Sequence, residues 1–231
     1  MKAIRIHLPL IVALLAGAST LAAEPPAPFT SNEEYGAFLQ SYHKNPQPER
    51  IEAAIRYVAG SDVMTNDDTD LMTQATFSCL FARYPDRKAA FKRSIASLDE
   101  PARAYFQRAI DSDPADLFLQ VPLQPKKNDM SWGCYSVTGD VSYAQDVIAA
   151  LKNLGERQDI LKYLTASSAQ WSLSGIARDD AKVRAALEQA AKDKNRVVAD
   201  AARDALQKPP SAIRAESIEV LKAQRAAGVW K

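Results

Sequence analysis

Apolar side chains recur three and four residues apart along most of the chain from residue 31 onward. The first two stripes contain Tyr35, Phe38, Leu39 and Tyr42, followed by Ile51, Ala54, Ile55 and Val58. This spacing is typical of amphipathic helices with one buried face. No segment alternates polar and apolar residues for long enough to predict a strand. The pattern therefore predicts an all-α protein.

Capping residues and prolines predict where the helices begin and end. In the first half, helices are predicted to begin near Ser31, Pro48, Asn66, Asp86, Asp99 and Asp113. In the second half, they are predicted over residues 129–137, 141–154, 159–177, 180–192 and 195–206, with a last helix capped by Ser211.

One interruption divides the helical pattern. Residues 121–128 read VPLQPKKN, and two prolines in five residues exclude a helix interior. We interpret this stretch as a connector between an N-terminal half, 31–120, and a C-terminal half, 129–231, which together form one continuous domain. Turns of a few residues between helices favour antiparallel helix pairs. We expect a solenoid-like or irregular bundle.

The stretch 180–206 looks most like a repeat. Residues 179–190 and 194–206 each have a polar start, an early Val and an Ala-rich face. This pair resembles a HEAT-type helix pair. An ordinary Ala-rich amphipathic pair accounts for the pattern equally well.

The first 23 residues are typical of a secretory signal peptide. Lys2 and Arg5 precede an apolar run, LPLIVALL, and small residues then offer cleavage after Ala22 or Ala23. The run is shorter than the roughly 20 residues that span a bilayer, which disfavours the alternative of an uncleaved anchor. A Pro-rich leader follows at residues 24–30. We expect a periplasmic or secreted protein.

The charge balance limits the kinds of partner. Lys and Arg number 29 and Asp and Glu 28 in the whole chain, and loss of Lys2 and Arg5 with the signal leaves a net charge near −1. This balance gives no electrostatic attraction to nucleic acid or anionic membranes. No later apolar run approaches 18 residues. We therefore expect a soluble protein that binds neither nucleic acid nor membrane after cleavage.

Two cysteines, Cys79 and Cys134, would be exported together. An oxidising compartment favours a disulfide between them. The bond would join the two halves and close a loop of about 55 residues, worth roughly 4 kcal/mol at most in the chain-entropy model. The alternative is two buried free thiols that act as small apolar groups.

Few residues suggest chemistry. His43 is the one histidine beyond the signal, and we interpret it as a surface residue capping a helix end. Ser41 and Lys44 match a Ser-x-x-Lys pattern, but no Lys-Thr-Gly follows. The acidic stretch 66–70 opens like a calcium loop, but Leu71 stands where glycine is required. We predict no catalytic residue, metal site or cofactor.

Trp132, Tyr135 and Trp171 occur in segments rich in Ser, Gly and Ala. Small residues let helices approach closely, and we expect the aromatic rings to fill the core beside them, Trp171 in particular. The alternative is that the three rings line one concave groove and anchor a partner.

These segments also carry a resemblance. The features are Met130, Trp132, Thr138-Gly139-Asp140, Ala169, Trp171-Ser172-Leu173 and Val183-Arg184. Together they resemble a family of exported bacterial α-helical proteins without assigned activity. The resemblance implies a helical fold and supplies no active residues.

The hypothesis from the sequence is an exported α-helical binding or scaffolding protein that engages another protein outside the cytoplasm, because stacked helix pairs create concave surfaces. Two alternatives remain open. One is a periplasmic inhibitor or immunity-type protein. The other is an enzyme whose carboxylates converge in a helical cleft.

Overall fold

The computed structural model describes residues 27–67 and 69–230. Within this part of the chain it has twelve α-helices, four short 3-10 turns and no strand. The prediction of an all-α fold is confirmed. The predicted signal peptide, residues 1–23, lies outside the described residues, as does the beginning of the Pro-rich leader.

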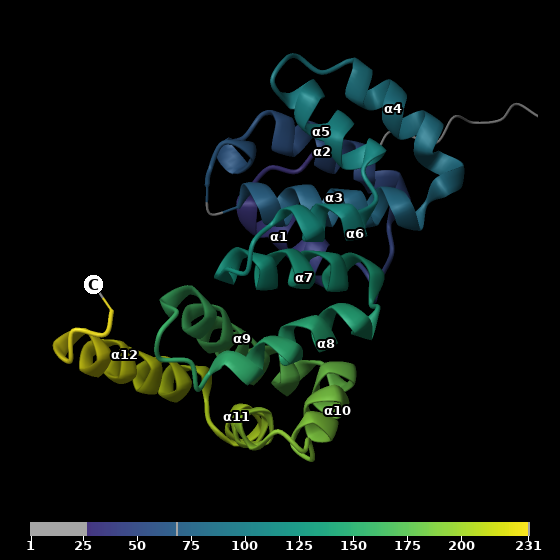
Figure 1. Ribbon diagram of the computed structural model, residues 1–231. Helices are drawn as coiled ribbons and strands as arrows, with labels where there is room; N and C mark the ends of the chain where they lie inside the picture. Colours follow the sequence, from purple (N-terminus) through teal and green to yellow (C-terminus); the bar gives the residue numbers. More distant parts are fainter. Residues whose placement is uncertain (1–26, 68, 231) are drawn as a thin grey trace, which may run out of the picture.

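Six helices precede the connector and six follow it. The first six are α1 (Asn32–Ser41), α2 (Ile51–Ala59), α3 (Asp70–Arg83), α4 (Lys88–Ala96), α5 (Ala102–Asp111) and α6 (Pro114–Gln120). The others are α7 (Pro125–Thr138), α8 (Val141–Ala150), α9 (Ile160–Asp179), α10 (Ala181–Ala190), α11 (Arg196–Gln207) and α12 (Pro210–Ala226). Figure 1 shows them stacked in successive layers, with α7 between the two halves.

Side-chain caps set six of the helix starts. The residues that accept hydrogen bonds from first-turn N–H groups are Ser31, Asp113, Asp140, Asp159, Asp180 and Asn195. Each satisfies a backbone donor that the helix itself leaves free. Three predicted caps are wrong. Asp86 lies in a 3-10 turn, α5 begins after Pro101 rather than at Asp99, and Ser211 lies inside the first turn of α12.

The connector is shorter than predicted. Pro125 is the first residue of α7, where its missing N–H and fixed φ are compatible with a helix. The predicted boundary at residue 129 therefore falls inside α7. This helix contributes Met130 and Val137 to the core of the first half and Tyr135 to the core of the second. Both cores thus share α7.

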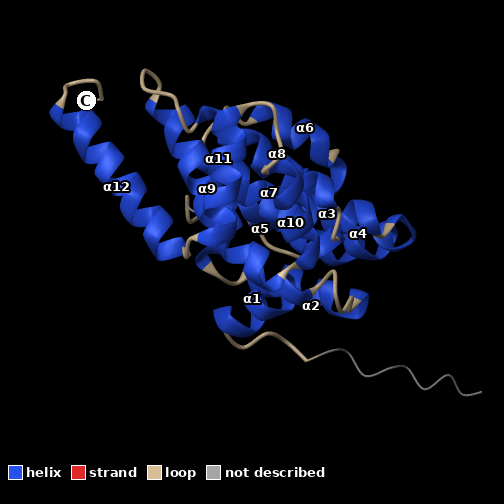
Figure 2. Ribbon diagram, turned by 90° about the horizontal axis from the view of Figure 1, so that it is seen from below, coloured by secondary structure: helices blue, strands red, loops and turns tan. Residues whose placement is uncertain are grey.

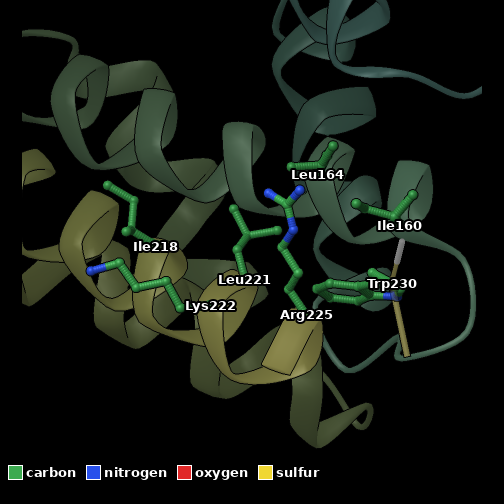
Figure 3. Close-up of a pocket in the computed structure, with 7 residues that line it drawn as sticks. All are labelled: Ile160, Leu164, Ile218, Leu221, Lys222, Arg225 and Trp230. Atoms are coloured by element: carbon green, nitrogen blue, oxygen red, sulfur yellow. The ribbon is translucent and has the colours of Figure 1, made fainter. Parts of the chain in front are cut away.

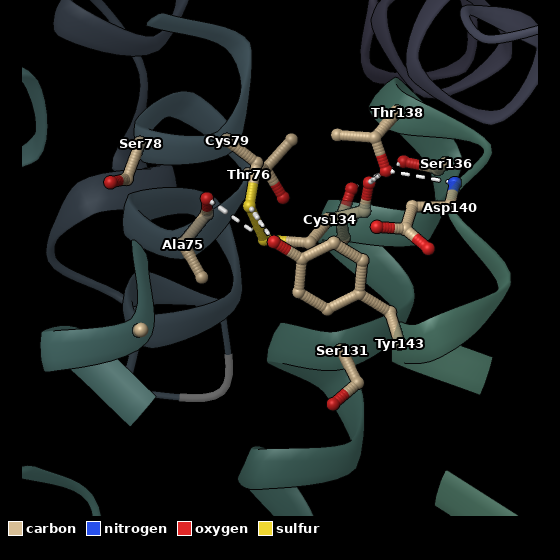
Figure 4. The surroundings of a disulfide bond; sticks show 12 residues. Ala75, Thr76, Ser78, Cys79, Ser131, Cys134, Ser136, Thr138, Asp140 and Tyr143 are labelled. Carbon is tan, nitrogen blue, oxygen red and sulfur yellow. Dashed lines mark hydrogen bonds between the residues drawn. A yellow bond between two sulfur atoms is a disulfide. The ribbon is translucent and has the colours of Figure 1, made fainter. Parts of the chain in front are cut away.

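The predicted disulfide is confirmed. Cys79 of α3 and Cys134 of α7 are bonded, with their Cα atoms 5.4 Å apart (Figure 4). The two helices pack closely here because Gly133 faces α3. A Cβ on Gly133 would lie 3.1 Å from the Met72 carbonyl oxygen and would also meet the Thr76 side chain. The bond thus ties the N-terminal half to the helix that both cores share.

The last helix is the least buried. Only Ile213 of α12 is buried, and Figure 2 shows the helix along one edge of the molecule. The chain turns at Gly228, which has φ of 72°, and returns Trp230 to the body, where its ring centroid lies 5.0 Å from that of Tyr163. Among the described helices, none combines the length and hydrophobicity needed to cross a membrane.

Candidate binding groove between α6, α7 and α8

A large groove lies where α6, α7 and α8 meet, and we call it the α6–α8 groove. Its volume is ≈ 770 Å³, within the range of roughly 300–1,000 Å³ that is usual for ligand sites. The helices contribute Phe118 and Leu119 from α6, Lys127 and Ser131 from α7, and Tyr143 and Asp146 from α8, with Leu123 from the connector. Both halves of the chain therefore build it.

Exposed apolar side chains mark the rim of this groove. Leu119 is 82% exposed and Leu123 is 39% exposed. The cause is local. Leu117, Phe118 and Leu119 are consecutive in a seven-residue helix, and only Leu117 is fully turned into the core. Three adjacent positions cannot share one face of a helix, so the other two border the groove. Exposed large apolar groups that gather at a cavity are typical of binding surfaces.

Tyr143, at the bottom of the groove, contacts the disulfide. The Tyr143 ring lies 6.0 Å from the Phe118 ring, and its hydroxyl oxygen lies 3.3 Å from Sγ of Cys79 (Figure 4). Burial raises the pKa of Tyr143, and the negative charges of Asp140, Asp146 and Asp113 raise it further. The phenol therefore stays neutral at physiological pH and can act as a hydrogen-bond donor.

The polar side of the groove carries two carboxylates, Asp113 and Asp146, and two lysines, Lys127 and Lys152. Asp113 also caps α6, which leaves Asp146 as the carboxylate without a capping role. Partial desolvation raises the pKa of Asp146; Lys127 opposes the shift and Asp140 adds to it. The ammonium group of Lys127 donates to the Val121 carbonyl, 3.2 Å away, so part of its hydrogen-bonding capacity serves the connector. Asn128 is occupied as well, because its Nδ2 donates to the Thr165 carbonyl at 2.8 Å. The groove thus combines an apolar rim with charged groups of both signs, among them Asp146.

The aromatic residues singled out in the sequence lie elsewhere. Tyr135 is 4% exposed, and its ring packs edge-on against Trp132 with centroids 5.9 Å apart. Trp132 is half-buried, and its Nε1 donates to Ser172 Oγ at 2.9 Å. Trp171 is 46% exposed, so the expectation that it fills the core is wrong. None of the three borders the α6–α8 groove.

His43 joins the two halves instead of capping a surface helix. Its side chain is 9% exposed, Nδ1 lies 3.1 Å from the Ser136 carbonyl oxygen, and Nε2 lies 3.8 Å from Oδ2 of Asp180. The surface interpretation is therefore wrong. The ring also packs on Gly139, where a Cβ would come within 2.9 Å of it. Both ring nitrogens face structural groups, which indicates a role in packing.

Asp180 is the charged centre of this contact. It caps α10 through the N–H groups of Lys182 and Val183, and it lies 3.6 Å from the Lys44 ammonium. Burial alone would raise the pKa of Asp180, but the Tyr135 hydroxyl facing it, the two N–H groups and Lys44 together hold the pKa below its usual value. Asp180 therefore stays ionised at neutral pH and stabilises the contact between the halves.

Two further results bear on this site. Within the described residues, no group of three or more His, Cys, Asp or Glu side chains is arranged to hold a metal ion. No protein family, curated protein or solved structure matches this chain. The resemblance to exported bacterial helical proteins therefore stays a hypothesis.

The residues that define the groove were not singled out from the sequence. Leu119, Leu123, Tyr143 and Asp146 lie in three different elements that only the packing of α6 against α8 brings together. One feature of the sequence could have indicated the exposed rim. Three consecutive apolar residues in the short helix α6 cannot all face the core, so at least one of them is exposed.

Proposed function

We propose that this is an exported binding protein that holds an apolar segment of another protein in the α6–α8 groove. The observation that carries the proposal is Leu119, which is 82% exposed at the rim of this groove. An exposed leucine on its own is ordinary. Together with Leu123, Phe118 and the Tyr143 ring, Leu119 forms an apolar surface that a bound partner would shield from water.

The surroundings favour a helical segment as the partner. The groove lies between helices, and an amphipathic helix lays apolar residues into such grooves at positions i, i+3, i+4 and i+7. Asp146 supplies a negative charge at the edge of the apolar surface. A basic residue on the polar face of the partner helix would complement it and improve specificity.

Export rests on separate observations. The order of charge, apolar run and small residues over 1–23 predicts secretion. The Cys79–Cys134 disulfide supports an oxidising compartment, where such bonds persist. The inhibitor or immunity-type alternative differs in the identity of the partner, which would be a hydrolase or a toxin.

Site-specific photo-crosslinking in cells that export the protein tests the proposal. A benzophenone amino acid at position 119 should give a discrete protein adduct. The same group at Leu161, which is 51% exposed on α9 and does not border the groove, is the matched control. Asp146→Lys should weaken the adduct at position 119 several-fold, because it reverses the charge at the groove.

Glu188→Lys, an equal charge reversal at an exposed position of α10, should leave the adduct unchanged. Mass spectrometry of the adduct then identifies the partner and the crosslinked segment. Identical adducts at positions 119 and 161, or equal effects of the two charge reversals, would contradict the proposal.

A further inference from the structure

A second groove lies between the start of α9 and the exposed helix α12. Its volume is ≈ 390 Å³, about half that of the α6–α8 groove. Its apolar lining consists of Ile160, Leu164, Ile218, Leu221 and Trp230. Figure 3 shows these side chains converging from α9, α12 and the C-terminal segment. We call it the α9–α12 groove.

The charges around this groove do not cancel. Lys222 pairs with Glu219 at 2.9 Å, and Asp159 at the start of α9 pairs with Lys162 at 3.7 Å. Arg225, in contrast, has no ion pair with any described residue. Figure 3 shows its guanidinium extending from α12 towards Leu164, across the apolar floor. Arg225 is exposed, so its guanidinium is hydrated and, with no counter-ion beside it, is free to pair with an anionic ligand.

Trp230 lines the groove from the C-terminal segment, and Figure 3 shows its indole nitrogen on the side of the ring away from the Arg225 guanidinium. Its side chain is 4% exposed against Tyr163, and its Nε1 is buried without an acceptor in the described part of the chain. Buried polar groups in proteins are almost always hydrogen-bonded. The unpaired guanidinium of Arg225 beside an apolar floor matches a ligand with an anionic head and an apolar tail.

We propose that the α9–α12 groove binds a small amphiphile with one alkyl chain and a carboxylate head, of the fatty-acid class. The carboxylate pairs with Arg225, whose planar fork suits a two-oxygen anion. The chain lies along Ile218 and Leu221 of α12, which face Ile160 and Leu164 of α9. From position 218 to 225 the helix rises by roughly 10 Å, enough for part of a single chain.

The size of the groove favours a small ligand over a protein segment. Its volume lies near the lower end of the roughly 300–1,000 Å³ that is usual for small-molecule sites. Nothing in this proposal depends on the α6–α8 groove, because the two cavities share no lining residue.

Calorimetric titration of the exported protein with dodecanoate, below its micelle concentration, tests the proposal. We expect saturable binding at one site. Arg225→Gln should weaken it about tenfold or more, as expected for loss of a charge-assisted hydrogen bond. Lys222→Gln is the matched control, because this lysine borders the same groove but is already paired with Glu219, and it should change affinity less than about twofold.

Dodecyltrimethylammonium, which has the same chain and a positive head, should not bind. Absence of saturable binding, equal binding of the two amphiphiles, or an Arg225→Gln variant as tight as wild type would overturn the proposal. Capture of a peptide but not of dodecanoate would overturn it as well.

Discussion

The two cores are built from different kinds of side chain. The first buries nine aromatic rings, namely Phe29, Tyr35, Phe38, Tyr42, Phe77, Phe81, Phe91, Tyr105 and Phe106. The second has Tyr135 as its one buried aromatic residue and otherwise consists of Ala, Val, Leu and Ile. Its seven buried alanines are Ala144, Ala150, Ala169, Ala177, Ala201, Ala202 and Ala205. Helix α7 contributes to both.

The difference has a physical consequence for each half. Large rings fill space between short helices and bury much apolar area per residue, so their loss leaves large cavities. Alanines let helices approach closely, so the second core is sensitive to added volume instead. The two halves should therefore respond in opposite ways to changes in side-chain size.

Deleting a ring from the first core should have the largest effect. Phe106 is fully buried, with its ring centroid 4.9 Å from that of Phe77. Phe106→Ala should lower the free energy of unfolding by about 3–5 kcal/mol, through lost transfer energy and the cavity left behind. Urea unfolding measures the loss. The exposed Leu119→Ala is the control and should stay within about 0.5 kcal/mol of wild type; similar losses for both would contradict this account.

Removing the disulfide should cost nearly as much. The double variant Cys79→Ala, Cys134→Ala should lose up to about 4 kcal/mol, because the bond closes a loop over a sequence separation of 55. Reduction of the wild-type protein should give a similar decrease in urea. If the variant unfolds at the wild-type midpoint, the bond contributes nothing to the coupling of α3 and α7.

Adding volume to the second core should have an intermediate effect. Ala169 is fully buried in α9. Ala169→Leu should cost about 1–3 kcal/mol, because the surrounding helices have no space for the larger side chain. Ala185→Leu, at an exposed position of α10, is the matched control and should be nearly neutral. A stabilised Ala169→Leu protein would show that the second core contains a void.

Low pH should weaken the contact that Asp180 makes between the two halves, and so lower the free energy of unfolding. The pKa of Asp180 is lower in the folded than in the unfolded protein, so its stabilisation is present above the unfolded value of about 4 and is lost as the pH falls through the folded pKa. Asp180→Asn can still cap α10 but cannot titrate, so its stability should fall less between neutral pH and pH of about 3. Asp180→Ala, which also loses the cap, should cost a further ~1 kcal/mol. Parallel acid losses in wild type and Asp180→Asn would refute the assignment.

Trp171 should have the smallest effect. It is 46% exposed, so Trp171→Ala should change the free energy of unfolding by roughly 0.5 kcal/mol or less. Trp132→Ala is the informative comparison, because that ring packs on Tyr135 and donates to Ser172. Thermal unfolding should show a clear decrease for Trp132→Ala alone. A large decrease for Trp171→Ala would mean that the exposed ring is covered.

Much of the fold could be predicted from local signals. Caps such as Asp140, Asp159 and Asn195 act within their own first turn, so their effect is visible in the sequence. The disulfide could be predicted because an exported pair of cysteines has few alternatives. Asp86 and Asp99 misled the prediction, since Pro85, next to Asp86, and Pro101, two residues after Asp99, shift where the helices begin.

The site could not be predicted in the same way. The α6–α8 groove depends on where α6 lies relative to α8, and no periodicity within either helix specifies that packing. The same limit explains Trp171. A tryptophan among small residues fits a buried or an exposed face equally well, and only the neighbours of α9 determine which applies. His43 became an interhelical contact because Asp180, 137 positions away by sequence number, lies beside it.

The sequence by itself determined the all-α class, most helix boundaries and the pairing of Cys79 with Cys134, because periodicity, capping and cysteine number act locally or leave few choices. The tertiary structure decided that α7 serves two cores, that His43 meets Asp180, and that two grooves form beside α6 and α12. These features depend on contacts between residues far apart in the chain. The packing of whole helices determines which of those residues meet.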